Sequence, residues 1–209
     1  MIETSLPIID ATAIDPPDRR PSVAGVLLAA GTSSRFGAEN KLLASLDGTP
    51  IVRHAASTLA GSALDPVVAV VGHDGDAVQR ALEGLDVEPV ENPAYRSGQA
   101  SSLRTGIDRI AERDVDAVVV ALGDMPTVSE ETIETLVAAY ANGVGDPLAA
   151  AVDGTRGNPV LFGRRHFETL ADVEGDTGGR KILLTDPESA LIEVDDPGVR
   201  YDVDTPADL

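Results

Sequence analysis

Short apolar runs alternate with longer amphipathic stretches from Val23 to the end of the 209-residue chain. The apolar runs cover residues 23–29, 66–72, 87–90, 115–122, 148–152 and 191–194. Between them, residues 51–59, 76–82, 101–110 and 130–141 carry apolar side chains at the three- and four-residue spacing of a helix. Such alternation predicts a mostly parallel sheet with helices on both faces, that is, a single three-layer α/β/α domain.

The first 22 residues do not share this pattern. They contain scattered apolar residues and four prolines, with no long apolar run. We expect residues 1–22 to be a flexible extension, or the product of a start site placed too early, and residues 23–209 to form the domain. Because neither a secretory signal nor a membrane-length segment is present, we expect a cytoplasmic protein. Thr127, three residues before Glu130, predicts a capping box at the helix over residues 130–141.

Charge and cysteine content exclude several classes of protein. Asp and Glu number 35 against 16 Lys and Arg, giving a formal net charge of −19. A nucleic-acid binder needs a basic face, and a membrane-surface helix needs a basic polar side, so neither partner is expected. The absence of cysteine excludes disulfides, thiolate metal sites and cysteine nucleophiles.

Lysine is nearly absent from the chain. Among the 16 basic residues, only Lys41 and Lys181 are lysines. An acidic, lysine-poor composition is typical of proteins adapted to high salt, where screening weakens self-repulsion. An arginine-rich coding bias is the simpler alternative, and either origin draws attention to the two lysines that remain.

The loop after the first expected strand has the composition of a phosphate-binding loop. It reads Leu28-Ala29-Ala30-Gly31-Thr32-Ser33-Ser34-Arg35-Phe36-Gly37, and Lys41 follows. Glycines permit close backbone approach, the hydroxyls and amides offer donors, and Arg35 and Lys41 add charge. The loop matches neither the Walker A pattern nor the dinucleotide-binding glycine fingerprint.

Five more segments place polar or charged residues where ligands bind in such sheets, beyond the carboxyl ends of strands. An Asn-Pro turn at Asn92 leads through Gly98 into a helix that begins near Ser101 and Ser102. Asp124 follows a central strand, where a Mg²⁺ ligand facing phosphates would lie. The remaining segments are Gly157-Asn158-Pro159-Val160-Leu161-Phe162, Gly175-Asp176-Thr177-Gly178-Gly179-Arg180-Lys181-Ile182-Leu183 and Tyr201-Asp202-Val203-Asp204-Thr205-Pro206-Ala207-Asp208.

Together these segments resemble, in order, the signature of the molybdenum cofactor cytidylyltransferases. That family belongs to the nucleotidyltransferases with the Rossmann-like, nucleotide-diphospho-sugar transferase fold. Phe36 replaces a common Met, and three residues rather than two separate Gly37 from Lys41. The resemblance implies catalytic roles for Arg35, Lys41 and Asp124, and a Mg²⁺ site at Asp124 and Asp204, with Asp202 as a second candidate. It implies substrate binding by Leu28, Ala29, Ala30, Gly31, Thr32, Ser33, Arg35, Lys41, Gly98, Ser101, Ser102, Asn158 and Arg180.

The activity implied is Mg²⁺-dependent transfer of CMP from CTP to the phosphate of a molybdopterin-type acceptor, with release of pyrophosphate. Seven of the 16 basic residues lie in or beside the matching segments: Arg35, Lys41, Arg96, Arg104, Arg156, Arg180 and Lys181. Cations there would help two polyanions to meet. The Ala-Ala-Gly of the loop resembles cytidylyltransferases, and a molybdenum enzyme is the expected recipient of the product.

Four alternatives remain open at this stage. The nucleotide could be GTP, or the acceptor could be another phosphorylated compound such as a sugar phosphate. Some relatives are redox enzymes that use a nicotinamide cofactor, although the dinucleotide fingerprint is absent here. A cofactor carrier without catalytic activity is the last alternative. Zinc is not expected, because the three histidines are far apart in sequence and no cysteine assists them.

Overall fold

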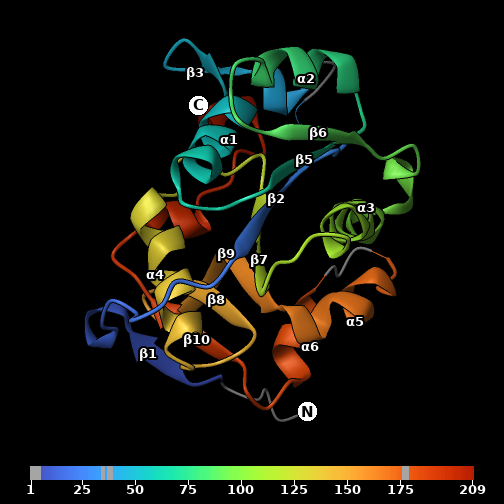
Figure 1. Ribbon diagram of the computed structural model, residues 1–209. Coiled ribbons are helices and arrows are strands. Elements are labelled where there is room, and N and C mark those ends of the chain that lie inside the picture. Colours follow the sequence, from blue (N-terminus) through green and yellow to red (C-terminus); the bar gives the residue numbers. More distant parts are fainter. Residues whose placement is uncertain (1–5, 34–35, 37–39, 176–178) are drawn as a thin grey trace.

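An eight-stranded sheet forms the centre of the molecule (Figure 1). The computed structural model describes residues 6–33, 36, 40–175 and 179–209. The strand order is β1-β10-β8-β9-β7-β2-β5-β6, and every neighbouring pair is parallel except those that include β9. The strands are β1 (Ile8–Asp10), β2 (Val23–Ala29), β5 (Val67–Val71), β6 (Glu88–Glu91), β7 (Ala117–Leu122), β8 (Leu148–Val152), β9 (Thr155–Gly163) and β10 (Ala190–Glu193). The prediction of a mostly parallel sheet is confirmed.

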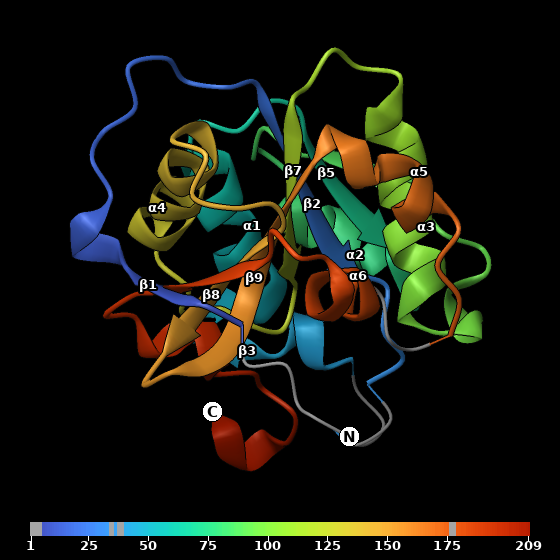
Figure 2. The ribbon, with the colours of Figure 1, turned by 90° about the horizontal axis from the view of Figure 1, so that it is seen from below.

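Helices cover both faces of the sheet, as predicted for a three-layer domain (Figure 2). One face packs against α1 (Ile51–Gly61), α2 (Gly75–Leu82) and α4 (Glu130–Ala141). The opposite face packs against α3 (Gln99–Ala111), α5 (Phe167–Ala171) and α6 (Arg180–Thr185). A small hairpin, β3 (Ser45–Leu46) and β4 (Thr49–Pro50), precedes α1. No helix in the described part of the chain combines the length and apolarity needed to cross a membrane.

The central strands read as continuous apolar runs because both of their faces are buried. In β2, Leu27 packs into the core on the α1 side, and its neighbour Val26 packs into the core on the α3 side. Successive side chains of a strand point to opposite faces, so burying both faces requires an apolar residue at almost every position. This is why the sequence pattern identified these strands.

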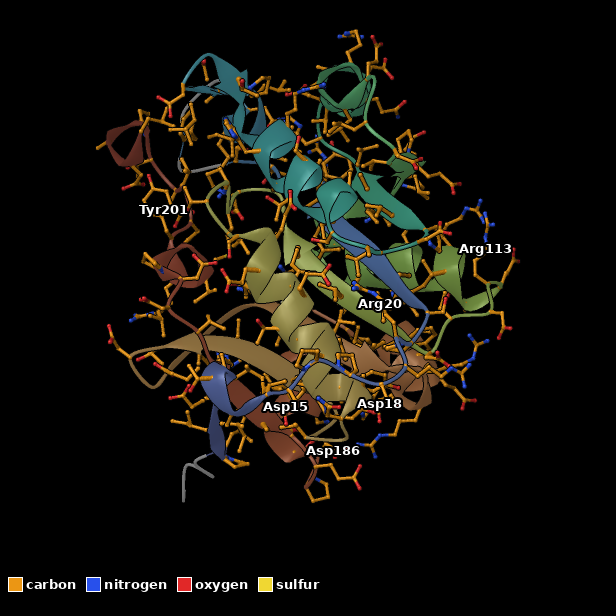
Figure 3. The ribbon with its side chains drawn as sticks, turned by 60° about the vertical axis from the view of Figure 1, so that its left-hand side comes forward. Asp15, Asp18, Arg20, Arg113, Asp186 and Tyr201 are labelled. Carbon is orange, nitrogen blue, oxygen red and sulfur yellow. The ribbon has the colours of Figure 1, made fainter. Side chains whose placement is uncertain are left out.

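Strand β1 differs from the expectation for the N-terminal segment. Ile8–Asp10 pairs in parallel with β10 and forms one edge of the sheet. Further along the segment, the Arg20 guanidinium lies 2.7 Å from the Glu134 carboxylate of α4 (Figure 3). Residues 8–10 are therefore part of the sheet rather than of a flexible extension, and the strand was too short to show a periodic pattern in the sequence.

Strand β9 was recognised in the sequence only as a motif. Gly157 and the Asn158-Pro159 pair are residues that usually interrupt strands. Here the absence of a side chain on Gly157 is required, since an added Cβ would lie 2.1 Å from the Val199 carbonyl oxygen. The tight approach of the C-terminal segment thus explains the glycine, and β9 continues on both sides of it as the antiparallel partner of β7 and β8.

The cap of α4 is also different from the one predicted. Ser129, rather than Thr127, is the N-cap residue, and its hydroxyl accepts a hydrogen bond from the Thr132 amide. Ser129 directly precedes the first helical residue, which is where a side-chain oxygen can reach the free amides of the first turn. Thr127 lies two residues before this N-cap position and is too early in the chain to do so.

Candidate functional site

A cavity of about 510 Å³ opens where β2 and β7 end, at the carboxyl edge of the sheet. Nine of the residues predicted from the sequence line it: Leu28, Ala30, Gly31, Thr32, Ser33, Lys41, Gly98, Ser102 and Asp124. They come from three segments that are far apart in the sequence. We call this the first cavity. Its position matches the rule that open α/β sheets bind ligands beyond the carboxyl ends of their strands.

Asn40 fixes the backbone between the loop and Lys41. Its buried side-chain oxygen accepts hydrogen bonds from the Leu42 amide and the Ser33 hydroxyl, each at 3.1 Å. Its amide nitrogen donates to the His73 carbonyl at 3.2 Å. The Lys41 amide in turn donates to the Ser33 hydroxyl oxygen at 3.1 Å. This network holds the start of a short 3₁₀-helix, Lys41–Leu43, against the loop, and so determines where the Lys41 side chain emerges.

Lys41 contacts both aspartates that were predicted to bind Mg²⁺. Its Nζ lies 2.6 Å from Asp124 Oδ2 and 3.1 Å from Asp204 Oδ1. The lysine side chain is only 13% exposed. Burial opposes the charge on Lys41, but the charges of Asp124 and Asp204 and their hydrogen bonds outweigh burial and raise the pKa of the ammonium. Lys41 is therefore fully protonated at neutral pH.

The C-terminal segment brings Asp204 to the site. The amide of buried Val203 donates a hydrogen bond of 2.9 Å to the Asp124 carbonyl. Asp208 Oδ2 accepts from the amides of Asp204 and Thr205, at 3.1 and 2.7 Å, in a capping box. These bonds hold the backbone on both sides of Asp204, so two residues separated by 80 positions in the sequence act on one lysine.

The donor set of this cluster fits a divalent cation that is also bound by phosphate. Within the described ranges no three His, Asp or Glu side chains converge as a complete metal site. Mg²⁺, however, is usually held by one or two carboxylates together with substrate phosphates. Asp124 and Asp204 direct one oxygen each toward the same ammonium nitrogen, so they already face a common positive charge.

The N-terminus of α3 forms another wall of the first cavity. Buried Asn92 donates to the hydroxyl oxygens of Ser101 and Ser102, at 2.9 and 3.0 Å. Ser102 lines the cavity, whereas Ser101 does not: its hydroxyl faces the Ala94 and Gly98 carbonyl oxygens, at 3.0 and 2.8 Å. Ser101 therefore fastens the turn before the helix, and Ser102 is the one placed to meet a ligand.

A second cavity, of about 260 Å³, adjoins the first. The two share Leu28, Gln99 and Leu122 as common lining residues. Asn158 and Arg180, which the resemblance assigns to substrate binding, both line the second cavity. A ligand in one cavity would therefore be separated from a ligand in the other only by these shared side chains.

Several residues fall outside this arrangement, and several others were not foreseen. Ala29 is buried in β2, and neither Arg104 nor Lys181 lines a cavity. Arg35 lies outside the described residues. Tyr95, Ser97 and Gln99, which line the cavities, were not predicted, whereas Arg96 and Arg156 were noted only as cations near the matching segments and also line them. Most of these lie within the matching segments, so proximity to a motif was the available signal.

Comparisons with known proteins agree with this architecture. Residues 25–190 match the model of the family described as "MobA-like NTP transferase domain". The chain is 29% identical to purine catabolism protein PucB of Bacillus subtilis, over 90% of this chain and 94% of that protein. It is 31% identical to nicotine blue oxidoreductase of Paenarthrobacter nicotinovorans, over 88% and 93% of the two chains.

Solved structures of other proteins also resemble the structure of this chain. The crystal structure of Rv0371c from Mycobacterium tuberculosis is 28% identical and superposes with a TM-score of 0.74, covering 90% of this chain and 95% of that one. Rv0371c has also been crystallised in complex with manganese, and that structure matches with a TM-score of 0.73 at 27% identity, over 90% and 95% of the two chains. The sequence match spans most of the sheet and the first cavity, and the chain belongs to the MobA-like NTP transferase family.

Proposed function

We propose that this nucleotidyltransferase transfers CMP from CTP to the phosphate of a molybdopterin-type acceptor. The observation that carries the proposal is the contact of Lys41 with Asp124 and Asp204 at the edge of the first cavity. Such a cluster suits a metal-bound triphosphate, and the adjoining second cavity offers a place for the acceptor. The product is the dinucleotide form of the cofactor, for use by a recipient molybdenum enzyme.

The reaction needs positioning and charge stabilisation more than covalent help. An ionised oxygen of the acceptor phosphate forms a bond to the α-phosphorus of CTP, and the bond from that phosphorus to the bridging oxygen breaks, releasing pyrophosphate. Lys41, together with Arg35, stabilises the negative charge that grows on the leaving group. Mg²⁺ held by Asp124 and Asp204 would supply further neutralisation of the phosphates, a role supported by the manganese complex of Rv0371c.

Ala30 supports the choice of CTP over GTP. Its buried methyl group lines the first cavity directly after β2, and it lies against the position of Gly72, whose added Cβ would come within 2.9 Å of it. The Ala30 methyl group narrows the first cavity. A narrower cavity favours the cytosine ring of CTP over the larger guanine ring of GTP. Competition of CTP against GTP for the purified protein tests the preference, and tighter binding of GTP would reverse it.

The activity is tested by incubating the protein with Mg²⁺, the molybdenum-loaded cofactor and each nucleotide in high salt. We expect pyrophosphate to be released with CTP and only when the cofactor is present. No release with any nucleotide would contradict the proposal. Release with a sugar phosphate in place of the cofactor would move the assignment to another acceptor.

A redox function is the second candidate, because nicotine blue oxidoreductase is among the relatives. That function requires a bound electron donor, for which NADPH is the probe. Saturable NADPH binding together with absence of pyrophosphate release would favour it. Binding of the molybdenum cofactor with neither pyrophosphate release nor redox activity would instead indicate a carrier.

A further inference from the structure

The second cavity combines an apolar interior with two guanidinium groups. Its apolar lining residues come from β2, α3, β7, β9 and α6: Leu28, Leu103, Val120, Leu122, Val160, Phe162 and Leu183. Its polar lining residues are Gln99, Arg156, Asn158 and Arg180. Among the residues that the structure describes, no carboxylate lines this cavity, although Asp and Glu outnumber Lys and Arg by 35 to 16 in the chain.

Strand β9 arranges this lining in order. Arg156, Asn158, Val160 and Phe162 of β9 all line the cavity, although the register of β9 against β8 shifts between Arg156 and Val160. Val160 and Phe162 lie beside Val120 and Val118 of β7, whereas Arg156 lies beyond the paired part of that strand. Of these β9 residues, Arg156 is therefore nearest the end of β7, which Asp124 follows. Val160 and Phe162 lie farther from Asp124.

Arg156 has no balancing carboxylate within the described part of the chain. Among the described residues, Arg20, Arg109 and Arg165 each contact a carboxylate at 2.6 to 2.7 Å, whereas the side chains of Arg156 and Arg180 form no ion pair or hydrogen bond. Burial, and then the positive charge of Arg180, lower the pKa of Arg156. Two neighbouring cations without a counter-charge are unfavourable unless an anion joins them.

We propose that Arg156 and Arg180 together bind the phosphate monoester of the acceptor, and that the apolar walls select an acceptor with a compact ring rather than a sugar. The inference rests on the proposed function for the role of that phosphate as the attacking group. Asn158 and Gln99 are placed to bond the polar edge of the ring.

The two guanidinium groups of Arg156 and Arg180 indicate the charge of the ligand. A phosphate monoester carries close to two negative charges above a pH of about 6, which matches two guanidinium groups, each suited to bidentate contact. A sugar would bring hydroxyls against seven apolar side chains, and hydroxyls buried without partners cost affinity. A ring with a polar edge would bury its faces against those side chains and keep its hydrogen bonds.

The test compares three probes by calorimetry: 6-hydroxymethylpterin monophosphate, the same pterin without phosphate, and glucose 1-phosphate. Wild-type protein is expected to bind the first at least tenfold more tightly than either of the others. Arg156→Met should weaken the phosphopterin tenfold or more while leaving the unphosphorylated pterin within twofold. Arg156→Lys should recover part of the loss, and Arg80→Met, an exposed arginine on α2, is the matched control.

Other outcomes separate this inference from the proposed function. Wild-type affinity for the phosphopterin in Arg156→Met, or a preference of the wild type for glucose 1-phosphate, would overturn the inference. Binding of CTP with Mn²⁺ serves as the folding control and should be unchanged in Arg156→Met. Phosphate-selective binding without any pyrophosphate release would leave the site standing and refute the transfer reaction alone.

Discussion

Asp124 occupies the most consequential position in the first cavity. It follows β7, contacts Lys41 and accepts the backbone hydrogen bond from Val203 that brings in the C-terminal segment. Its carboxylate is partly exposed. Its backbone carbonyl oxygen, in contrast, accepts the hydrogen bond that holds the C-terminal segment. A change confined to the carboxylate should therefore separate chemistry from folding.

Asp124→Asn is expected to reduce pyrophosphate release at least a hundredfold, because the amide removes a negative charge from the metal site. The fold should persist, since the backbone bond to Val203 is unaffected. Steady-state kinetics and circular dichroism measure the two effects. Asp108→Asn, on the exposed face of α3, is the control, and wild-type rates in Asp124→Asn would remove the metal-ligand role.

In the proposed metal site, Lys41 and a divalent cation would compete for the same two carboxylate oxygens. Lys41→Met should strengthen the binding of Mn²⁺ severalfold in the absence of nucleotide, because the competing ammonium is gone. It should weaken CTP binding, because a phosphate contact is lost. Electron paramagnetic resonance of Mn²⁺ measures the first effect. Lys181→Met is the control at the other lysine, and weaker Mn²⁺ binding in Lys41→Met would contradict the competition.

At the scale of elements, the cavities depend on close contacts between loops. Gly72 follows β5, and an added Cβ there would lie 2.6 Å from the Tyr95 Cβ and 2.9 Å from the Ala30 Cβ. Gly72→Ala should destabilise the fold by about 1–3 kcal/mol through this overlap and weaken CTP binding. Gly75→Ala, whose added Cβ meets only ordinary contacts, is the control in urea unfolding. Equal stabilities of the two variants would refute the steric argument.

Asp196 connects the C-terminal segment to the start of α4. Its buried carboxylate accepts from the Ser129 amide and hydroxyl, the Thr132 hydroxyl and the Gly198 amide. Asp196→Asn should cost about 2–3 kcal/mol, because charge-assisted hydrogen bonds are lost. The exposed neighbour Asp195→Asn should be neutral, and chemical denaturation of both variants measures the difference. Equal losses of stability in Asp196→Asn and Asp195→Asn would show that the hydrogen bonds to Asp196 do not stabilise the fold.

The same carboxylate makes stability depend on acidity. Burial would raise the pKa of Asp196, but the hydrogen bonds from Thr132, Ser129 and Gly198 outweigh it, so the pKa is lowered. Its contribution is therefore present above the unfolded value of about 4 and is lost as the pH falls through the lower folded value. Stability of the wild type should fall more steeply below pH 4 than that of Asp196→Asn.

At the scale of the whole molecule, charge is distributed unevenly. The chain carries 35 acidic and 16 basic residues, yet the described residues that line the two cavities include four basic side chains and one carboxylate: Lys41, Arg96, Arg156, Arg180 and Asp124. Anionic substrates can therefore bind to a protein with a net charge of −19. The remaining carboxylates repel one another across the rest of the molecule.

Salt should relieve that repulsion. Raising potassium chloride from about 0.1 to 1 M shortens the Debye length from about 10 to 3 Å. We expect the urea midpoint of unfolding to rise over this range, and an unchanged or lower midpoint would contradict adaptation to high salt. Binding of CTP should weaken over the same range, because screening also acts on the phosphate contacts.

The amino-acid sequence predicts the central strands, four helices and the segments that build the first cavity. It could do so because burial on both faces of a sheet imposes long apolar runs, and because a phosphate loop requires particular small and charged residues. Strands β1 and β9 were missed: one is three residues long, and the other contains Gly157 and Pro159.

Folding, rather than local sequence, determines how these segments meet. It brought Asp204 to Lys41 across 163 residues, turned Ser101 away from the cavity that Ser102 lines, and left Arg156 beside Arg180 without a carboxylate. Local sequence carries no record of such contacts, since they depend on strand order and on the path of the chain between elements. The types of residue at the site could therefore be predicted from the sequence. The pairing of their charges, in contrast, arises only on folding.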